Sequence, residues 1–235
     1  QSGAQSKAIV QSFLKNVDGI ILSPSEKENL SSVLELTQFY QKEVVLLEQN
    51  VDSITPLLSI QSDEVKAGQL MAKAILKKLP TQGRVAILTS SEPSPIYEDR
   101  MKGVKSILGY KRIEAVIQTK PDYKSALNSI KQAIDEDENQ DIKGWVFLDD
   151  WALRGTPDLP WKPNSIPLIT IQSSVMTNLF YDLRYLESMV LHPFHDWGYQ
   201  ASKTLIEKLF TKQNPDSNVL IFNPTLINPQ VFDVF

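Results

Sequence analysis

Short, unbroken apolar runs recur along this chain, and stretches with helical spacing lie between most of them. The first run, Gly19–Leu22, follows Asp18 and ends at Ser23-Pro24. Four apolar residues closed by a turn signal are typical of a strand buried on both faces. Similar runs stand at 44–47, 57–60, 85–88, 115–117, 145–148, 168–171 and 219–222. Buried strands that alternate with helices predict an α/β fold with parallel sheets.

The helices are predicted from apolar residues spaced three or four apart. Such stripes occur within 65–79, 123–134 and 197–210. Another helix should begin at Ser94-Pro95, because Ser is a favoured N-cap and Pro a favoured first helical residue. Four prolines fall within 156–167, which predicts a stiff surface connection there.

Polar side chains follow nearly every predicted strand. In open α/β sheets, ligands bind at the carboxyl ends of the strands. The repetition therefore predicts a binding cleft at that edge, although loop residues are commonly polar without any ligand. The residues concerned are Ser23, Glu48-Gln49-Asn50, Gln61-Ser62-Asp63, Thr89-Ser90-Ser91, Asp149-Asp150 and Gln172-Ser173-Ser174.

Arg100 adds a sharper signal. It lies at the edge of the core-facing stripe of the helix that begins after Ser94, near the end where the helix dipole disfavours a cation. An arginine that leans toward the carboxyl edge of a sheet suggests a fork of donors aimed at a ligand. The alternative is a structural ion pair with Asp149 or Asp150.

Composition excludes several classes of protein. The chain has 235 residues, of which 42% are hydrophobic and 22% charged, which argues against disorder. Its net charge of -4 gives no reason to expect bound nucleic acid. It has no cysteine, so disulfides, thiol catalysis and Cys-ligated zinc are excluded. No apolar run approaches the roughly 18 residues of a membrane span, so we expect no membrane insertion.

Signals for catalysis, cofactors and metals are weak. The chain has no G-x-S-x-G, P-loop or G-x-G-x-x-G motif. His192, His195 and Asp196 are close in sequence but lack further obvious ligands, so we expect no metal. Asp149 and Asp150 are adjacent, and neighbouring side chains on one loop usually point apart, which favours binding or capping over a catalytic pair. We therefore expect neither an enzyme nor a cofactor.

Five segments, taken in order, resemble those of the type I periplasmic sugar-binding proteins and of the lactose-repressor-type effector domains that share their fold. The resemblance extends over essentially the whole chain. The segments are the run VDGIILSP at 17–24, Gln61-Ser62-Asp63-Glu64 followed by Ala67-Gly68, the GRVAIL stretch at 83–88, the EDRMKGV stretch at 98–104, and 191–198.

The resemblance implies two Rossmann-like lobes with parallel sheets, joined by three crossovers, with a small polar ligand clamped between them. The crossover-like stretches place residues 1–62 plus 193–213 in the first lobe and 63–192 plus 214–235 in the second. The family opens with a strand, a helix and a second strand that this chain lacks, so we expect an N-terminally truncated first lobe. Such a lobe would expose the edge of Gly19–Leu22.

The resemblance also implies ligand contacts at matching positions. Arg100 matches the ligand-binding arginine of the family, and Asp149 stands where the family usually has Asn or Asp. The other positions depart from the common sugar-binding pattern and imply an unusual sugar, a nucleoside-like molecule or another small solute. Gln172 stands in place of an Asp, His192 in place of a hinge Gln, and Glu48-Gln49 in place of Asp-Arg.

Aromatic residues near predicted strand ends or the hinge complete the candidate site. A sugar face stacks on such rings, although core packing is the commoner fate of any one of them. Of Tyr97, Tyr123, Trp151 and Trp197, we select Tyr123 and Trp151 as candidate ligand contacts.

The expected function is therefore non-catalytic binding of a sugar or sugar-like solute, for transport or sensing. The expected partner is a membrane transporter or receptor, and the expected location is periplasmic or extracytoplasmic. The alternative is the effector-binding domain of a cytoplasmic transcription regulator. A signal peptide or a helix-turn-helix ahead of Gln1 would discriminate between the two. In either case we expect the lobes to close on the ligand by hinge rotation.

Overall fold

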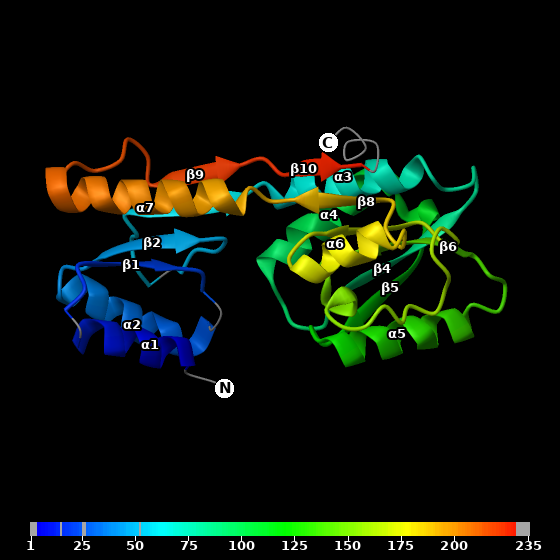
Figure 1. Cartoon of the computed structure of the whole chain (residues 1–235), viewed down its shortest axis with the longest axis horizontal. Helices are drawn as coiled ribbons and strands as arrows, with labels where there is room; N and C mark the ends of the chain where they lie inside the picture. The colour runs from blue at the N-terminus through cyan, green and yellow to red at the C-terminus, as the bar shows by residue number, and fades with distance from the viewer. Residues whose placement is uncertain (1–3, 15, 25–26, 52, 229–235) are drawn as a thin grey trace. The chain divides into compact units, whose positions relative to one another are not determined.

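The chain divides into two compact units (Figure 1). The structure, a computed structural model, describes residues 4–14, 16–24, 27–51 and 53–228. Unit 1 comprises Gln1–Ser62 and Pro193–Phe222, and unit 2 comprises Asp63–His192 and Asn223–Phe235. Each unit has its own sheet, which confirms the α/β class and the two parallel sheets expected from the sequence.

Unit 1 is built on four parallel strands in the order β1-β2-β3-β9. Alternate residues of β2 face opposite sides of this sheet, as the twofold repeat of a strand requires. Val44 and Leu46 pack in a cluster with Ile9, Leu30 and Leu34 of α1 and α2, whereas Val45 packs with Trp197 and Ala201 of α7. The elements are α1 (Ala4–Leu14), β1 (Gly19–Leu22), α2 (Lys27–Phe39), β2 (Glu43–Leu47), β3 (Leu58–Ser62), α7 (Phe194–Thr211) and β9 (Val219–Phe222).

Unit 2 is built on six strands in the order β10-β8-β7-β6-β4-β5, of which only β10, at one edge, is antiparallel. Its elements are α3 (Glu64–Leu76), β4 (Arg84–Ser90), α4 (Pro95–Leu108), β5 (Ile113–Thr119), α5 (Tyr123–Glu136), β6 (Ile142–Phe147), β7 (Leu168–Ile171), α6 (Val175–Asp182), β8 (Ser188–Leu191) and β10 (Thr225–Ile227). Two 3-10 turns, η1 (Tyr110–Arg112) and η2 (Trp151–Leu153), complete it.

Two hydrophobic clusters cover the two faces of the unit 2 sheet. Val85 and Ile87 of β4 pack with residues of α3 and α4. Ala86 and Leu88 face the other way, into the cluster that contains residues of α5, η2 and α6. Both faces of the central strands are therefore buried, which is why these strands appear in the sequence as continuous apolar runs.

One expected boundary is wrong. Residues 214–235 were expected in the second lobe, but β9 pairs in parallel with β3 and so completes the unit 1 sheet. Leu220 and Phe222 of β9 pack with the cluster that holds Trp197. Only from Asn223 does the chain belong to unit 2, and residues 229–235 lie outside the described residues.

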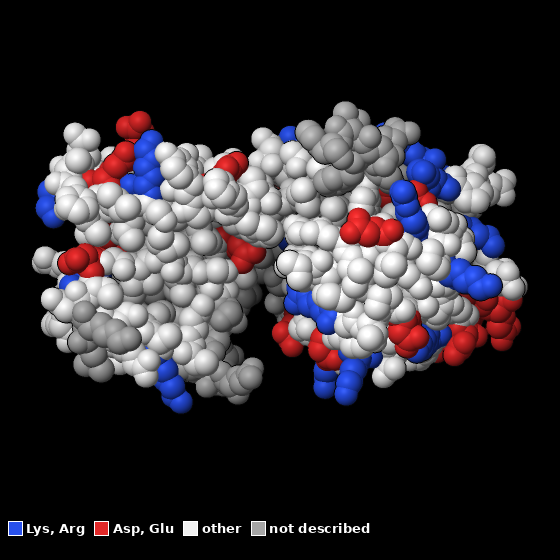
Figure 2. Space-filling model, in the orientation of Figure 1, with Lys and Arg blue, Asp and Glu red and all other residues white. Residues whose placement is uncertain are grey.

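Figure 2 shows Lys and Arg interspersed with Asp and Glu on the visible face of each unit. Among the described residues, no helix combines the length and the hydrophobicity that a membrane-spanning segment needs.

Candidate functional site

Five parallel strands of unit 2 end at one edge of their sheet, and a polar residue stands at or just after the end of each. Ser90 and Thr119 are the last residues of β4 and β5. Asp149, Gln172 and His192 follow β6, β7 and β8 within two residues. The structure thus brings three of the predicted site residues to the carboxyl edge of one sheet, where ligands bind in α/β folds.

Arg100 of α4 contacts residues that follow β6 and β8 at this edge, and most of its donor groups already have partners inside the protein. The residue is only 5% exposed. Its Nε donates to Glu64 Oε2 at 2.6 Å, and its Nη1 donates to the carbonyl oxygen of Leu148 at 2.7 Å. Nη2 lies 3.4 Å from His192 Nε2, and Nη1 lies 3.7 Å from Asp149 Oδ2. Burial alone would lower the pKa of Arg100, but Glu64 and Asp149 more than offset it and raise the pKa.

Two glycines allow Arg100 to reach Glu64. A Cβ atom on Gly68 of α3 would stand 2.0 Å from the carbonyl oxygen of Arg100, and one on Gly103 of α4 would stand 2.0 Å from that of Val65. Only glycine permits so close a crossing of the two helices. Helix α4 begins at Pro95 as predicted, and its close approach to α3 sets the Arg100–Glu64 ion pair.

Asp150 holds the loop after β6 against the start of α6. Its carboxylate is buried and accepts hydrogen bonds from Thr177 Oγ1 at 2.6 Å, Ser174 Oγ at 2.7 Å and Arg154 Nε at 2.6 Å. Burial raises the pKa of Asp150, but the bonds from Thr177 and Ser174 and the charge of Arg154 outweigh it, so the pKa is lowered. Asp150 is therefore a structural carboxylate, fully occupied by its neighbours.

Asp149 is also bonded to Arg154, but its carboxylate is less completely bonded than that of Asp150. Its Oδ1 accepts from the Asp150 backbone N–H at 2.7 Å and from Arg154 Nη2 at 2.8 Å. Among the described residues, its Oδ2 accepts only a long hydrogen bond from the Tyr97 hydroxyl at 3.4 Å, and Arg100 Nη1 lies 3.7 Å from it. Burial raises the pKa of Asp149 to about 6, against the opposing charges of Arg100 and Arg154.

The two predicted aromatic contacts serve the packing of unit 2. Trp151 is buried in the core cluster and meets the Tyr97 ring edge-on, with the ring centroids 5.2 Å apart. Tyr123 lies against Gly155, and its hydroxyl donates to the carbonyl oxygen of Thr156 at 3.0 Å. Trp151 thus supports the ring beside Asp149, whereas Tyr123 fixes the loop that follows η2. A ligand contact by either stays a prediction.

The remaining predicted residues have different settings. Gln172 is half-buried, and its backbone N–H donates to the carbonyl oxygen of Val190 at 2.9 Å. His192 is buried, with Nε2 3.5 Å from Glu64 Oε1. Glu48 and Gln49 follow β2 in unit 1, where the Ser23 hydroxyl donates to Glu48 Oε2 at 2.6 Å. Glu48 has a positive φ of 68°, which is uncommon for a residue other than glycine.

Sequence reasoning missed three side chains at this edge: Glu64, Tyr97 and Arg154. Glu64 stood out only as part of a crossover motif, and Tyr97 only as an aromatic residue. The signal for Arg154 was its place four residues after Asp150, a spacing that pairs opposite charges across a helical turn.

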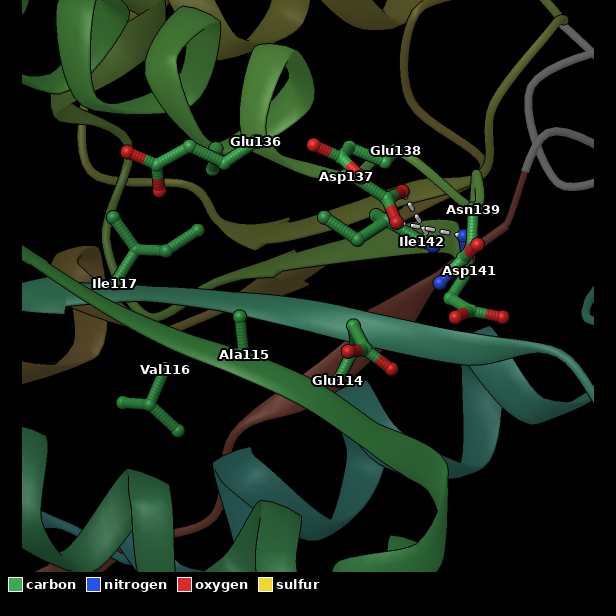
Figure 3. Close-up of a pocket in the computed structure, with 11 residues that line it drawn as sticks. Glu114, Ala115, Val116, Ile117, Glu136, Asp137, Glu138, Asn139, Asp141 and Ile142 are labelled. Carbon is green, nitrogen blue, oxygen red and sulfur yellow. Dashed lines mark hydrogen bonds between the residues drawn. The ribbon is translucent and has the colours of Figure 1, made fainter.

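A hollow lies away from this edge, between β5 and α5 (Figure 3). Carboxylates line it, including those of Glu114, Glu136 and Asp141. The Asp137 carboxylate accepts from the backbone N–H groups of Asp141 at 2.8 Å and Ile142 at 2.9 Å, so it closes the loop that leads into β6. No group of three or more potential metal ligands occurs among the described residues. The hollow therefore offers acidic side chains without a recognisable site.

Solved structures with the same fold include several solute-binding proteins. The periplasmic ribose ABC transporter of Conexibacter woesei is 18% identical, with a TM-score of 0.82, and the match covers 99% of this chain and 80% of that one. A Caulobacter myo-inositol binding protein is 16% identical, with a TM-score of 0.80 over 98% of this chain and 80% of that one.

A periplasmic solute-binding protein of Actinobacillus succinogenes, solved with D-allose, is 16% identical, with a TM-score of 0.83 over 98% of this chain and 85% of that one. At this level of identity the three structures show that the fold is shared.

No curated protein matches the sequence. The family described as periplasmic binding protein domain matches residues 1–158. Because this match spans more than half of the 235 residues, the chain belongs to the periplasmic binding protein domain family.

Proposed function

We propose that this chain binds a small, hydroxyl-rich solute, a sugar or a close relative, at the carboxyl edge of the unit 2 sheet. The observation that carries the proposal is the arrangement around Asp149. Arg154 holds this carboxylate through one oxygen, and in the part of the chain that the structure describes the other oxygen has no donor closer than the Tyr97 hydroxyl at 3.4 Å. Gln172 and Ser90 stand at the ends of other strands of the same sheet. Hydroxyl groups are recognised by such mixtures of acceptors and donors.

The contacts support binding rather than catalysis. Asp150, the second carboxylate of the pair, already accepts from Thr177, Ser174 and Arg154. A carboxylate engaged in this way holds a loop in place and is a poor general base, because its lone pairs are occupied. The family and the similar solved structures point in the same direction, since their names describe binding proteins and transporters.

We further propose that the protein delivers its solute to a membrane transporter from a periplasmic or other extracytoplasmic location. Membership of the periplasmic binding protein domain family supports this proposal, and so do the names of the ribose and D-allose relatives in fold. The effector-domain alternative stays a prediction.

A thermal-shift screen tests the proposed function. The panel would contain D-ribose, D-arabinose, D-allose, myo-inositol and D-galactose, each from micromolar to millimolar concentration. A ligand present at 100 times its Kd stabilises the folded state by about 2.7 kcal/mol, which raises the melting temperature measurably. We expect at least one member to do so with a saturable dose response, followed by calorimetric determination of Kd. A panel without any saturable shift would count against sugar binding.

A further inference from the structure

Arg100, the arginine expected to bind the ligand, has few N–H donors that are not already bonded within the protein. A guanidinium group carries five N–H donors. In Arg100, Nε is bonded to Glu64, Nη1 is bonded to the Leu148 carbonyl oxygen, and Nη2 lies beside His192. Only 6% of its side chain is exposed. A solute that reached this group would have to displace bonds inside the protein.

The guanidinium of Arg154, at the same edge, is more accessible to a ligand. The side chain of Arg154 is 42% exposed. Its Nε is fixed by Asp150 at 2.6 Å and its Nη2 by Asp149 at 2.8 Å. Within the described part of the chain, Nη1 makes no hydrogen bond. Two charge-assisted hydrogen bonds thus hold the guanidinium of Arg154 in place. Binding of a ligand at Nη1 therefore costs less side-chain entropy than it would at a mobile arginine.

Asp149 supplies the matching acceptor. Its Oδ1 is occupied by Arg154 and by the Asp150 backbone, whereas Oδ2 has no donor closer than the Tyr97 hydroxyl at 3.4 Å within the described part of the chain. A solute with several hydroxyl groups can accept a hydrogen bond from Arg154 Nη1 and donate one to Asp149 Oδ2, because each hydroxyl carries one donor and two acceptor sites.

The local charge selects against anions. Three carboxylates, those of Glu64, Asp149 and Asp150, surround the two guanidinium groups of Arg100 and Arg154. Counted formally, the three carboxylates outnumber the two guanidinium groups by one. A carboxylate or phosphate brought to Arg154 would therefore also meet Asp149 and Asp150, and like charges at short range in a partly buried site repel strongly.

We propose that Arg154, paired with Asp149, is the specificity-determining cation of the unit 2 site. Arg154 selects uncharged polyhydroxylated solutes over sugar acids and sugar phosphates. Arg100 only positions the residues at the carboxyl edge of the sheet. This inference rests on the proposed function. It goes further in naming the contacting residue and the charge of the ligand.

The test compares three variants against matched ligands by titration calorimetry. The probes are D-ribose with D-ribose 5-phosphate and D-galactose with D-galacturonate. Arg154→Gln removes the positive charge. Arg154→Lys keeps the charge but lacks the planar array of N–H donors of a guanidinium. The control is Arg84→Gln, since Arg84 is another arginine of unit 2 with a 39% exposed side chain, is paired with Glu114, and begins β4 at the end opposite the carboxyl edge.

We expect each anionic probe to bind the parent at least tenfold more weakly than its neutral counterpart. Arg154→Gln should weaken the neutral sugar at least tenfold, with an intermediate loss in Arg154→Lys and none in Arg84→Gln. Circular dichroism and the melting temperature of the ligand-free proteins separate this loss from a folding defect.

Two results would overturn the inference and leave sugar binding intact: parental affinity in Arg154→Gln, or tighter binding of a phosphate or acid than of its neutral counterpart. If the parent binds neither these four probes nor any member of the thermal-shift panel, both the inference and the proposed function fail.

Discussion

At the scale of single residues, Arg100 shows how a contact network changes the expected effect of a substitution. From sequence alone, Arg100 was expected to bind the ligand. In the fold it neutralises Glu64 and satisfies the Leu148 carbonyl oxygen. Removing one partner of a buried ion pair leaves the other charge uncompensated, which costs about 3–5 kcal/mol. The main role of Arg100 should therefore appear in stability.

We expect Arg100→Met to lower the free energy of unfolding by about 3–5 kcal/mol in urea denaturation. The double variant Arg100→Met/Glu64→Gln should recover part of this loss, because the orphaned carboxylate is then absent. An Arg100→Met protein as stable as the parent would show that the ion pair contributes nothing to folding.

Asp149 should make stability depend on pH in an unusual direction. Its pKa is raised to about 6 in the fold, chiefly by burial, and the groups that face it are Arg100, Asp150, Arg154 and Tyr97. Between about pH 4 and pH 6 the folded state then holds a proton that the unfolded state has released. A rise in pH disfavours the state that binds more protons, which here is the folded state. The contribution of Asp149 to the free energy of unfolding therefore decreases from about pH 4 to pH 6.

Urea denaturation of the parent and of Asp149→Asn at pH 4, 5, 6 and 7 tests this sign. The parent should lose stability relative to Asp149→Asn as the pH rises through this window, and the difference should level off above pH 6. The opposite trend would mean that the fold favours the ionised carboxylate.

The positions of Arg100 and Asp149 were predictable, whereas their partners were not. Helical spacing placed Arg100 at the margin of an apolar stripe, and a buried apolar run placed Asp149 directly after a strand. Both signals are local. Glu64 reaches Arg100 only because α3 and α4 cross closely, and no local pattern encodes the contact of residues 36 positions apart.

At the scale of elements, the crossing of α3 and α4 depends on Gly68 and Gly103. A methyl group at either position would stand 2.0 Å from a backbone carbonyl oxygen of the other helix. Backbone cannot move aside as a flexible side chain does, so the helices would have to separate. That separation would also pull Arg100 away from Glu64.

We therefore expect Gly68→Ala and Gly103→Ala each to cost at least the roughly 1–3 kcal/mol of an overpacked core. Gly198→Ala is the matched control. Gly198 lies in α7, where an added Cβ meets nothing within 4 Å, so the change should be neutral or stabilise by up to about 1 kcal/mol. Chemical denaturation measures all three, and stable Gly68→Ala and Gly103→Ala proteins would contradict the close crossing.

The elements that sequence reasoning missed are the short ones. Strand β8 (Ser188–Leu191) ends in a segment predicted only as a hinge, and β10 (Thr225–Ile227) was not identified. Strand β10 has only three residues, which is too short for a periodic signal. Helix α6 has only eight residues and leaves Val175 and Leu179 exposed, so its apolar pattern does not indicate which face is buried.

At the scale of the whole molecule, the chain passes from one unit to the other after Ser62, His192 and Phe222. The first two passages were predicted, because family-like segments mark them. The third was misplaced, because Val219–Phe222 is an apolar run that fits either sheet. Only the pairing of β9 with β3 assigns it to unit 1, and pairing between segments about 160 residues apart cannot be inferred from local sequence.

Two separate cores predict two unfolding transitions, and the tryptophans can tell them apart. Trp145, Trp151 and Trp161 lie in the core of unit 2, whereas Trp197 is the tryptophan of unit 1. In a Trp197→Phe variant, the fluorescence therefore reports unit 2. Domains with their own cores commonly unfold in separate steps, so a calorimetric scan should contain a transition that matches this fluorescence and a second one that does not.

If Asp149 and Arg154 contact the solute, a neutral sugar that binds must raise the transition of unit 2. At 100 times its Kd, the ligand adds about 2.7 kcal/mol to the stability of the state that binds it. The midpoint of thermal unfolding followed by the fluorescence of Trp197→Phe should therefore move upward with sugar concentration, and the added substitution Arg154→Gln should reduce this shift at the same sugar concentration. A sugar that binds this variant but leaves its fluorescence midpoint unchanged would place the dominant contacts outside the edge formed by β4 to β8.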